Sequence, residues 1–133
     1  MARDGRMATF RVEAIPPSLN QWSRQARIAA HRLKVDYGHY VALAVRQARR
    51  RGTWDGERFE RARCVLRYHF PTAGRRDPDN YAGKFLLDGL VAEGVLADDD
   101  WSHLVLVLER GRTARPGWVE IVVEEIREGR EEA

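Results

Sequence analysis

The segment 61–70 constrains the fold most, because its side chains alternate in character. Every second residue from Ala62 to Phe70 is apolar, whereas the alternate positions from 61 to 69 include three arginines and a histidine. Successive side chains of a β-strand point to opposite faces, so this pattern predicts a strand with one buried and one exposed face. The chain is therefore expected to form a sheet that is covered on one side.

The remaining segments predict further strands and two helical regions. In chain order, the expected elements are a strand at 9–15, a helical stretch at 24–51, the strand at 61–70, a helix at 80–92, and strands at 103–109 and 118–125. Within the first helical stretch, Gly38 is a candidate break and Asp36 a candidate cap for a second helix. The strand at 103–109 is apolar on both faces, which favours a central position. We expect an α/β fold of the α+β type, with a mixed four-stranded sheet, the order β-α-β-α-β-β and helices packed on the sheet.

Length and composition indicate one domain in a reducing compartment. The chain has 133 residues and no apolar run near the ~20 residues that a membrane span needs. No apolar signal segment follows the start, and Cys64 is the only cysteine, which excludes an internal disulfide. We expect a cytoplasmic protein without an organic cofactor. The domain is expected to cover residues 7–126, with an N-terminal extension at 1–6 and a charged, frayed tail at 127–133.

Charge is distributed unevenly along the chain. Residues 1–76 contain 17 Lys and Arg against 6 Asp and Glu, whereas residues 77–133 contain 6 against 14. The first part therefore carries a net charge of +11 and the second −8, which sum to the overall +3. A basic part beside an acidic part favours a polyanionic partner together with a cation for the carboxylates.

An acidic motif at 75–80 is a candidate metal site. Asp77 precedes a proline, which disfavours helical backbone, and residues two apart on an extended chain point the same way. Asp77 and Asp79 are therefore expected to direct their carboxylates to one point, where hard oxygen ligands suit Mg²⁺ or Mn²⁺. The alternative is an ordinary strand-to-helix turn in which Asp79 caps the helix.

A second acidic segment and a lysine flank the helix expected at 80–92. Asp98, Asp99 and Asp100 are consecutive, and their mutual repulsion falls when a cation binds there; a solvated loop is the alternative. Lys84 either pairs with Asp88 one turn later or stabilises charge on a phosphate. For Asp88 a structural role is favoured over metal ligation. No P-loop and no histidine-based zinc spacing is present.

Several basic and polar residues are candidates for phosphate contacts with DNA. Trp22 is expected to pack rather than to stack on a base. The candidate DNA-binding residues are Asn20, Arg24, Arg49, Arg50, Arg67, Arg75 and Arg76.

Taken together, these motifs resemble the RusA family of Holliday-junction resolvases. The resemblance covers 7 to about 125, including the segments 7–10 and 16–20, and is strongest from Arg75 to Asp99. It implies a Mg²⁺-dependent endonuclease that acts as a homodimer on four-way DNA junctions in recombination and repair. It also implies that Asp77, Asp79 and Asp99 are the catalytic, metal-binding aspartates, with Asp98 as an alternative ligand, and that Lys84 is the catalytic lysine.

The chain departs from this family pattern at two places. One extra residue separates Asn80 from Lys84, and the triplet Asp98–Asp99–Asp100 stands where a pair is usual. Two alternative functions stay open: a non-catalytic DNA-binding protein that keeps the fold, and a nuclease of other branched DNA.

Overall fold

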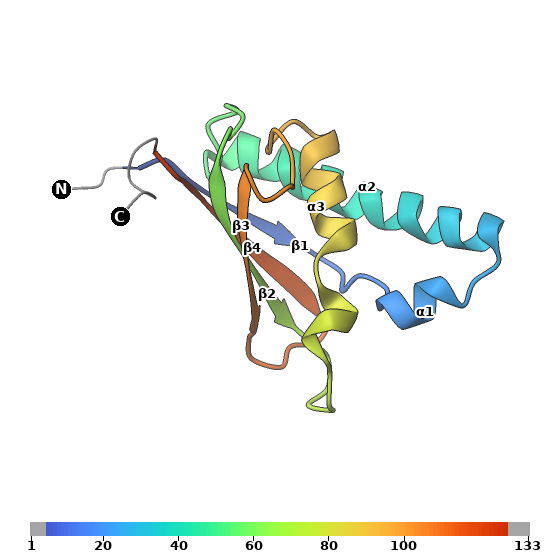
Figure 1. Ribbon diagram of the computed structural model, residues 1–133. Helices are drawn as coiled ribbons and strands as arrows, with labels where there is room; N and C mark the ends of the chain where they lie inside the picture. Colours follow the sequence, from blue (N-terminus) through green and yellow to red (C-terminus); the bar gives the residue numbers. More distant parts are fainter. Residues whose placement is uncertain (1–4, 128–133) are drawn as a thin grey trace.

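The computed structural model describes residues 5–127 and contains one mixed sheet with its helices on one side (Figure 1). The elements are β1 Met7–Val12, α1 Leu19–Ser23, α2 Arg27–Arg51, β2 Ala62–His69, the 3₁₀ helix η1 Pro78–Tyr81, α3 Lys84–Ala92, β3 Leu104–Arg110 and β4 Trp118–Glu125. The α+β class, the four-stranded mixed sheet and the predicted order of strands and helices are confirmed. Most of the extension predicted at 1–6, and nearly all of the tail predicted at 127–133, lie outside the described residues.

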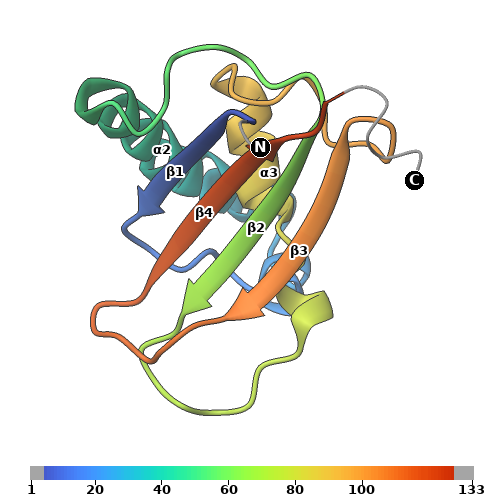
Figure 2. The same ribbon diagram turned by 90° about the vertical axis from the view of Figure 1, so that its left-hand side faces the viewer.

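The sheet has the strand order β1-β4-β2-β3. Strand β4 is antiparallel to both β1 and β2, whereas β2 and β3 are parallel and joined by a crossover through α3. The central position predicted for the strand at 103–109 is wrong, because β3 lies at an edge of the sheet (Figure 2). The central strands are β4 and β2, and β2 is the strand whose alternation was clearest in the sequence.

The core lies between one face of the sheet and the helices. The apolar face predicted for 62–70 is buried, and the odd-numbered residues of β4 join it: Val119, Ile121 and Val123 have no exposed surface. Helix α2 packs against β1 and α3, and the opposite face of the sheet carries no helix (Figure 1). No helix between residues 5 and 127 has the length and apolar character needed to cross a membrane.

The long helical stretch is not divided at Gly38. Helix α2 runs without a break from Arg27 to Arg51, so the predicted break at Gly38 and the cap at Asp36 are wrong. The separation falls earlier, between α1 and α2, where Ala26 adopts an extended conformation. Gly38 is tolerated because a single glycine in a long helix costs only about 1 kcal/mol. The helix ends at Gly52, whose positive φ of 81° suits glycine.

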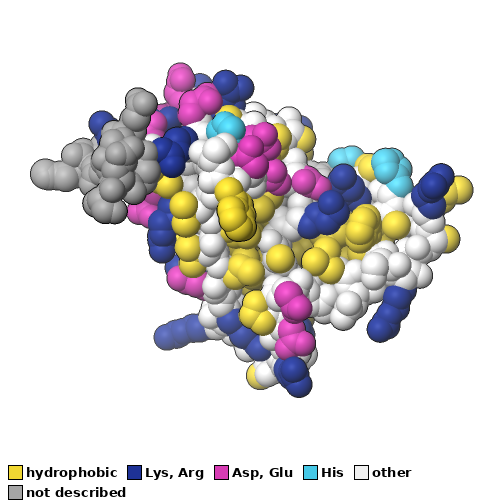
Figure 3. Space-filling view, viewed as in Figure 1, with side chains coloured by type: hydrophobic (Ala, Val, Ile, Leu, Met, Phe, Trp, Pro, Cys, Tyr) yellow, Lys and Arg dark blue, Asp and Glu magenta, His cyan; other side chains and the backbone are white. Residues whose placement is uncertain are grey.

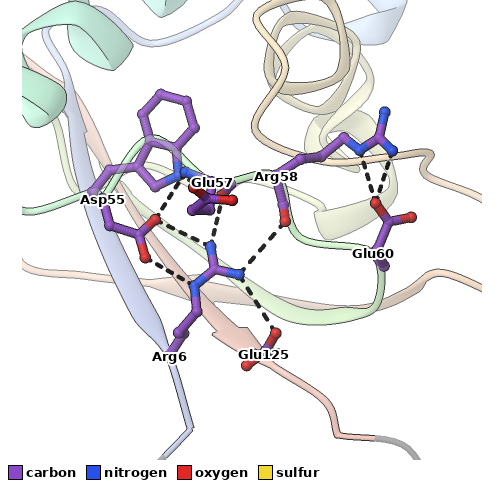
Figure 4. A network of polar contacts seen from close by, with 7 residues as sticks. Arg6, Asp55, Glu57, Arg58, Glu60 and Glu125 are labelled. Carbon is purple, nitrogen blue, oxygen red and sulfur yellow. Dashed lines mark hydrogen bonds and ion pairs between the residues drawn. The ribbon is translucent and has the colours of Figure 1, made fainter.

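Arg6 fixes the loop between α2 and β2 to the sheet (Figure 4). Its guanidinium binds both carboxylate oxygens of Asp55, at 3.0 and 3.2 Å, and donates to the carbonyl oxygen of Glu57 at 2.6 Å. It also lies 4.0 Å from the centroid of the Phe59 ring and 3.4 Å from a carboxylate oxygen of Glu125. The backbone amide of Glu57 and the Arg6 guanidinium lower the pKa of Asp55.

Candidate functional site

A pocket of about 90 Å³ lies at the carboxyl ends of the parallel strands β2 and β3. Ligands of open α/β sheets commonly bind outside the carboxyl ends of parallel strands, because the connecting loops leave a crevice there. The lining residues are Tyr68, Phe70, Arg76, Asp77, Pro78, Tyr81, Leu108, Glu109 and Arg110. The structure therefore brings one predicted catalytic aspartate and one predicted DNA-binding arginine into the same pocket.

Aromatic rings and two guanidinium groups shape this pocket. Phe70 stacks on Tyr68 with a centroid distance of 5.7 Å, and Tyr81 meets Phe70 edge-on at 5.0 Å. The Cζ atoms of Arg76 and Arg110 lie 4.6 and 5.2 Å from the centroid of the Phe70 ring. Two cations are thus held beside one ring, where they can bind an anion such as a phosphate.

The loop at residues 71–77 is held by the same two arginines. Arg110 donates to the carbonyl oxygens of Thr72 and Gly74, and Arg76 donates to the carbonyl oxygen of Gly74 and to the hydroxyl of Thr72. Tyr68 donates from its hydroxyl to the carbonyl oxygen of Tyr81 at 2.7 Å, and burial raises the pKa of that hydroxyl. These contacts fix the loop and η1 to the ends of β2 and β3.

Asp77 and Asp79 do not lie on one extended segment. Asp77 is extended, with φ −97° and ψ 132°, as expected for a residue before proline, but Pro78 and Asp79 belong to the 3₁₀ helix η1. The prediction that the two carboxylates share a direction along an extended chain is therefore wrong. Asp79 is also not the capping residue, because Asp77 occupies that position and its side chain makes no capping hydrogen bond.

The two aspartates differ in their contacts. Asp77 accepts a hydrogen bond from the exposed Arg75 side chain, with an Nε–Oδ1 distance of 3.2 Å. Among residues 5–127, the carboxylate of Asp79 has no hydrogen-bond or ion-pair partner. Asn80, the next residue, accepts a hydrogen bond at 2.8 Å from the backbone amide of Asn20, which places α1 beside η1. Asp79 thus offers an uncommitted charge on the surface next to α1.

Lys84 begins α3 and lies between a carboxylate and a ring. Its Nζ is 3.7 Å from Oδ2 of Asp88 and 5.6 Å from the centroid of the Trp22 ring. Lys34 of α2 also approaches Oδ2 of Asp88, at 3.5 Å. Asp88 thus lies within ion-pair distance of two lysines. Trp22 packs edge-on against Phe85, as expected.

The acidic triplet after α3 forms a compact group with a histidine. Ligand atoms of Asp98, Asp100 and His103 lie within 4.8 Å of one another. Asp100 is hydrogen-bonded through Oδ1 to Nδ1 of His103 at 2.6 Å; this contact raises the pKa of His103, and His103 and Ser102 lower that of Asp100. The side chain of Asp98 accepts from the backbone amide of Asp99 at 2.7 Å. Within the described part of the chain, the Asp99 carboxylate has no partner.

The structure does not bring Asp77, Asp79 and Asp99 together within one chain. Among residues 5–127, only one group of three potential metal ligands has ligand atoms within 4.8 Å of one another. That group consists of Asp98, Asp100 and His103. Helix α3, about 14 Å long, stands between the two acidic segments: η1 lies at one end and the loop before β3 at the other (Figure 1). The space-filling view likewise shows acidic side chains in separate upper and lower groups (Figure 3).

The predicted DNA-binding residues occupy several parts of the surface. Arg76 lines the pocket, Arg75 lies beside Asp77, and Asn20 and Arg24 lie in and directly after α1. Arg49 and Arg50 lie at the far end of α2, away from the loop at residues 71–77 (Figure 1). Arg67 is held on the open face of the sheet by Glu109 and Glu120, each at 2.7 Å. These two carboxylates offset its charge, which makes Arg67 a weaker candidate for a phosphate contact.

Three residues of these sites were missed in the sequence. Tyr81 and Arg110 join the pocket only because β3 runs parallel to β2 and ends beside it, a register that the sequence does not reveal. His103 was set aside with the other histidines. His103 lies three residues after Asp100, and this short spacing could have indicated the hydrogen bond between their side chains.

No known family model matches the chain, and no curated protein matches it.

Proposed function

We propose that the chain is a structure-selective endodeoxyribonuclease that hydrolyses phosphodiester bonds in four-way DNA junctions and depends on Mg²⁺, or on Mn²⁺ in its place. The observation that carries the proposal is the pocket at the ends of β2 and β3, which combines a carboxylate with two guanidinium groups. The resemblance of the segment from Arg75 to Asp99 to RusA-like resolvases gives the substrate class. Resolution of a junction needs two symmetric nicks, so the active form is expected to be a homodimer.

The pocket supplies the groups that binding of a phosphodiester needs. Arg76 and Arg110 hold positive charge at its rim, and the guanidinium fork matches a phosphate in geometry. During hydrolysis a water oxygen bonds to phosphorus, a phosphorus–oxygen bond to the sugar breaks, and negative charge grows on the remaining phosphate oxygens. Fixed cations stabilise that charge. Exposed Arg75 extends the positive surface along the DNA backbone.

A single chain supplies only part of the expected metal site. Asp77 and Asp79 offer carboxylate oxygens, the donors that Mg²⁺ and Mn²⁺ prefer, but Asp99 belongs to the segment at the other end of α3. The predicted ligand set therefore does not fit within one chain. Nζ of Lys84 forms an ion pair with Oδ2 of Asp88 at 3.7 Å. Contact between Lys84 and a phosphate would therefore require this ion pair to break.

The test is incubation with a synthetic four-way junction, with and without Mg²⁺, beside a linear duplex of the same sequence. Paired nicks in the junction only, and only with the metal, are expected. Asp77→Asn and Asp79→Asn should each reduce nicking at least about a hundredfold, the scale of losing one strong transition-state contact. Asp36→Asn removes an exposed carboxylate on α2 and serves as the matched control, with nicking unchanged. Equal cutting of the duplex, or full activity of both variants, would contradict the proposal.

One observation favours a second candidate, a junction-binding protein without nuclease activity. Because α3 separates Asp99 from Asp77, the two acidic segments do not form one metal site within a chain, and each can have a structural role instead. The same junction experiment distinguishes the two functions, since this candidate predicts a shifted band in a binding gel without nicks at any Mg²⁺ or Mn²⁺ concentration. Cutting of flaps in preference to four-way junctions would instead indicate a nuclease of other branched DNA.

A further inference from the structure

Two arginine-rich loops lie side by side at one end of the sheet (Figure 2). The loop at residues 71–77 follows β2, and a second loop, residues 111–117, joins β3 to β4. Together with the last residue of β3, they contain five arginines against one acidic residue, Asp77. The arginines are Arg75, Arg76, Arg110, Arg112 and Arg115. Arg112 and Arg115 are exposed and do not line the pocket that contains Asp77.

The second loop continues along β2 beyond the last paired residues of β2 and β3. The backbone amide of Gly111 donates to the carbonyl oxygen of Tyr68 at 2.8 Å, and that of Ala114 donates to the carbonyl oxygen of Phe70 at 3.0 Å. These hydrogen bonds fix the backbone on both sides of Arg112. A surface that is ordered before its ligand arrives loses less conformational entropy when the ligand binds.

His69 also holds the second loop in place. Its ring Nδ1 donates to the carbonyl oxygen of Arg112, with a distance of 2.8 Å between the two atoms. The ring stacks on Trp118, with centroids 4.3 Å apart and an angle of 10° between the planes. A Cβ atom built on Gly111 would overlap the ring of His69. The glycine thus leaves the space that His69 needs in order to contact the Arg112 backbone.

The arginines at this end of the sheet differ from those on its open face in their partners. On the open face, Arg63 and Arg67 each lie within 3.0 Å of a glutamate oxygen. Arg115 instead donates to the carbonyl oxygen of Pro71 at 3.4 Å, and the Arg112 side chain has no hydrogen-bond or ion-pair partner among residues 5–127. Because a carbonyl oxygen carries no net charge, the positive charge of these two guanidinium groups is not compensated.

We propose that the two loops form a basic rim that binds the phosphate backbone of a nucleic-acid strand beside the pocket, with Arg112 and Arg115 as its outer contacts. Guanidinium groups are permanently charged and match phosphate oxygens in geometry. Arg76 and Arg110 connect this rim to the pocket, because both lie beside the Phe70 ring. The position of the rim beside a cleavage site rests on the proposed function, whereas binding of a strand by the rim does not require cleavage.

The composition of the two loops favours a phosphate backbone over a lipid surface. Binding to a membrane interface depends on apolar side chains that enter it. None of the large hydrophobic side chains that are exposed between residues 5 and 127 lies in either loop. Contacts with phosphate do not read the bases, and fixed arginines need no metal. Binding at the rim is therefore expected to be independent of DNA sequence and of Mg²⁺, and to weaken steeply with salt.

Binding titrations without Mg²⁺ test the rim separately from cleavage. The probes are a synthetic four-way junction and linear duplexes of two different sequences, each followed by fluorescence anisotropy between about 50 and 200 mM salt. The double replacement Arg112→Ala and Arg115→Ala removes two phosphate contacts, so the slope of log K against log salt should fall by about two. The loss of affinity should be the same for both duplex sequences.

Two further double variants separate the effect of position from those of net charge and loop structure. Arg58→Ala with Arg63→Ala removes the same net charge, but these arginines lie at the opposite end of β2 and each binds a glutamate. Their slope should fall by less than half as much. Arg112→Lys with Arg115→Lys keeps both charges and should keep most of the slope, because lysine also binds phosphate. Circular dichroism checks that every variant is folded.

The outcomes distinguish failure of the rim from failure of the proposed function. An equal fall in slope for the Arg58 and Arg63 variant would overturn the rim, and so would a lysine variant that binds as weakly as the alanine variant. Wild-type protein that binds phosphatidylserine vesicles but not DNA would overturn nucleic acid as the ligand. Wild-type protein that binds DNA with the expected dependence on Arg112 and Arg115 but never nicks junctions supports the rim and refutes the proposed nuclease. Nicking by wild type, together with unchanged binding by the Arg112 and Arg115 alanine variant, supports the nuclease and refutes the rim.

Discussion

Replacing Gly89 with alanine should destabilise the protein, although alanine is the better helix former. Gly89 lies within α3, where this helix packs against α2. A Cβ atom built on Gly89 would lie 2.7 Å from Cγ1 and 2.9 Å from Cβ of Val41, which is fully buried. Carbon atoms attract one another best at about 3.5–4.0 Å, so the two helices would have to move apart. Because α3 separates the two acidic segments, such a movement also affects the candidate site.

Two opposing terms give the expected size of the effect. Alanine in place of glycine stabilises a helix interior by about 1 kcal/mol, whereas overpacking a core costs about 1–3 kcal/mol. The net loss for Gly89→Ala is therefore up to about 2 kcal/mol. Gly38 in α2 is the matched control, because a Cβ built there meets nothing within 4 Å. Gly38→Ala should stabilise by up to about 1 kcal/mol, and the difference between the two variants isolates the packing cost.

Thermal unfolding followed by circular dichroism measures both variants. For a chain of this length, 1 kcal/mol corresponds to about 4 °C in Tm. Gly38→Ala should raise the Tm by up to about 4 °C, and Gly89→Ala should lower it by up to about 8 °C. Urea titrations with unchanged m-values would show that the unfolded state is the same in both variants. If Gly89→Ala raised the Tm as much as Gly38→Ala, the α2–α3 contact would not be tight and the reasoning would fail.

Four further predictions concern charges and the thiol. Arg76→Ala should lower the slope of log K against log salt for junction binding by about one, whereas Arg67→Ala should leave it unchanged, because glutamates offset Arg67; equal effects of both would contradict this difference. Arg6→Lys should cost up to about 1 kcal/mol in urea unfolding, because lysine cannot reproduce the two-oxygen contact with the half-exposed Asp55. The lowered pKa of Asp55 stabilises the fold above its unfolded pKa of about 3.9, so the stability of wild-type protein relative to Asp55→Asn should fall below that pH. Burial raises the pKa of Cys64 to about 12, so a thiol reagent should label it only after unfolding.

The elements that could be predicted from sequence are those in which the alternation of apolar and polar side chains follows the alternation of buried and exposed positions. Residues 61–70 and 118–125 alternate because one face of β2 and of β4 packs on helices while the other stays open. The predicted bounds of β4 agree with the structure, and those of β2 differ by one residue at each end. Helix α3 begins at Lys84 rather than at residue 80, because Pro78 and the following residues form η1 first.

The arrangement of the site could not be predicted, because it depends on which strands become neighbours. The apolar pattern of residues 103–109 indicates that burial of these side chains is favourable. It does not reveal whether another strand of the same chain buries them. Arg110 joins the pocket of Asp77 only through the parallel register of β3 with β2. The sequence likewise showed that Asp77 and Asp79 precede a helix and that Asp99 follows it. It did not show that this helix, α3, would separate Asp99 from the other two aspartates.

The two largest departures from the sequence-based expectations both follow from the crossover through α3. Strand β3 was expected at the centre of a sheet, but the crossover places it parallel to β2 at an edge, where Val105 and Leu106 stay exposed. Asp99 was expected beside Asp77. Because β2 and β3 are parallel, Asp77, which follows β2, and Asp99, which precedes β3, lie toward opposite ends of these strands. The spacing of acidic residues along the chain therefore could not show which carboxylates converge, because that depends on the direction in which β3 pairs with β2.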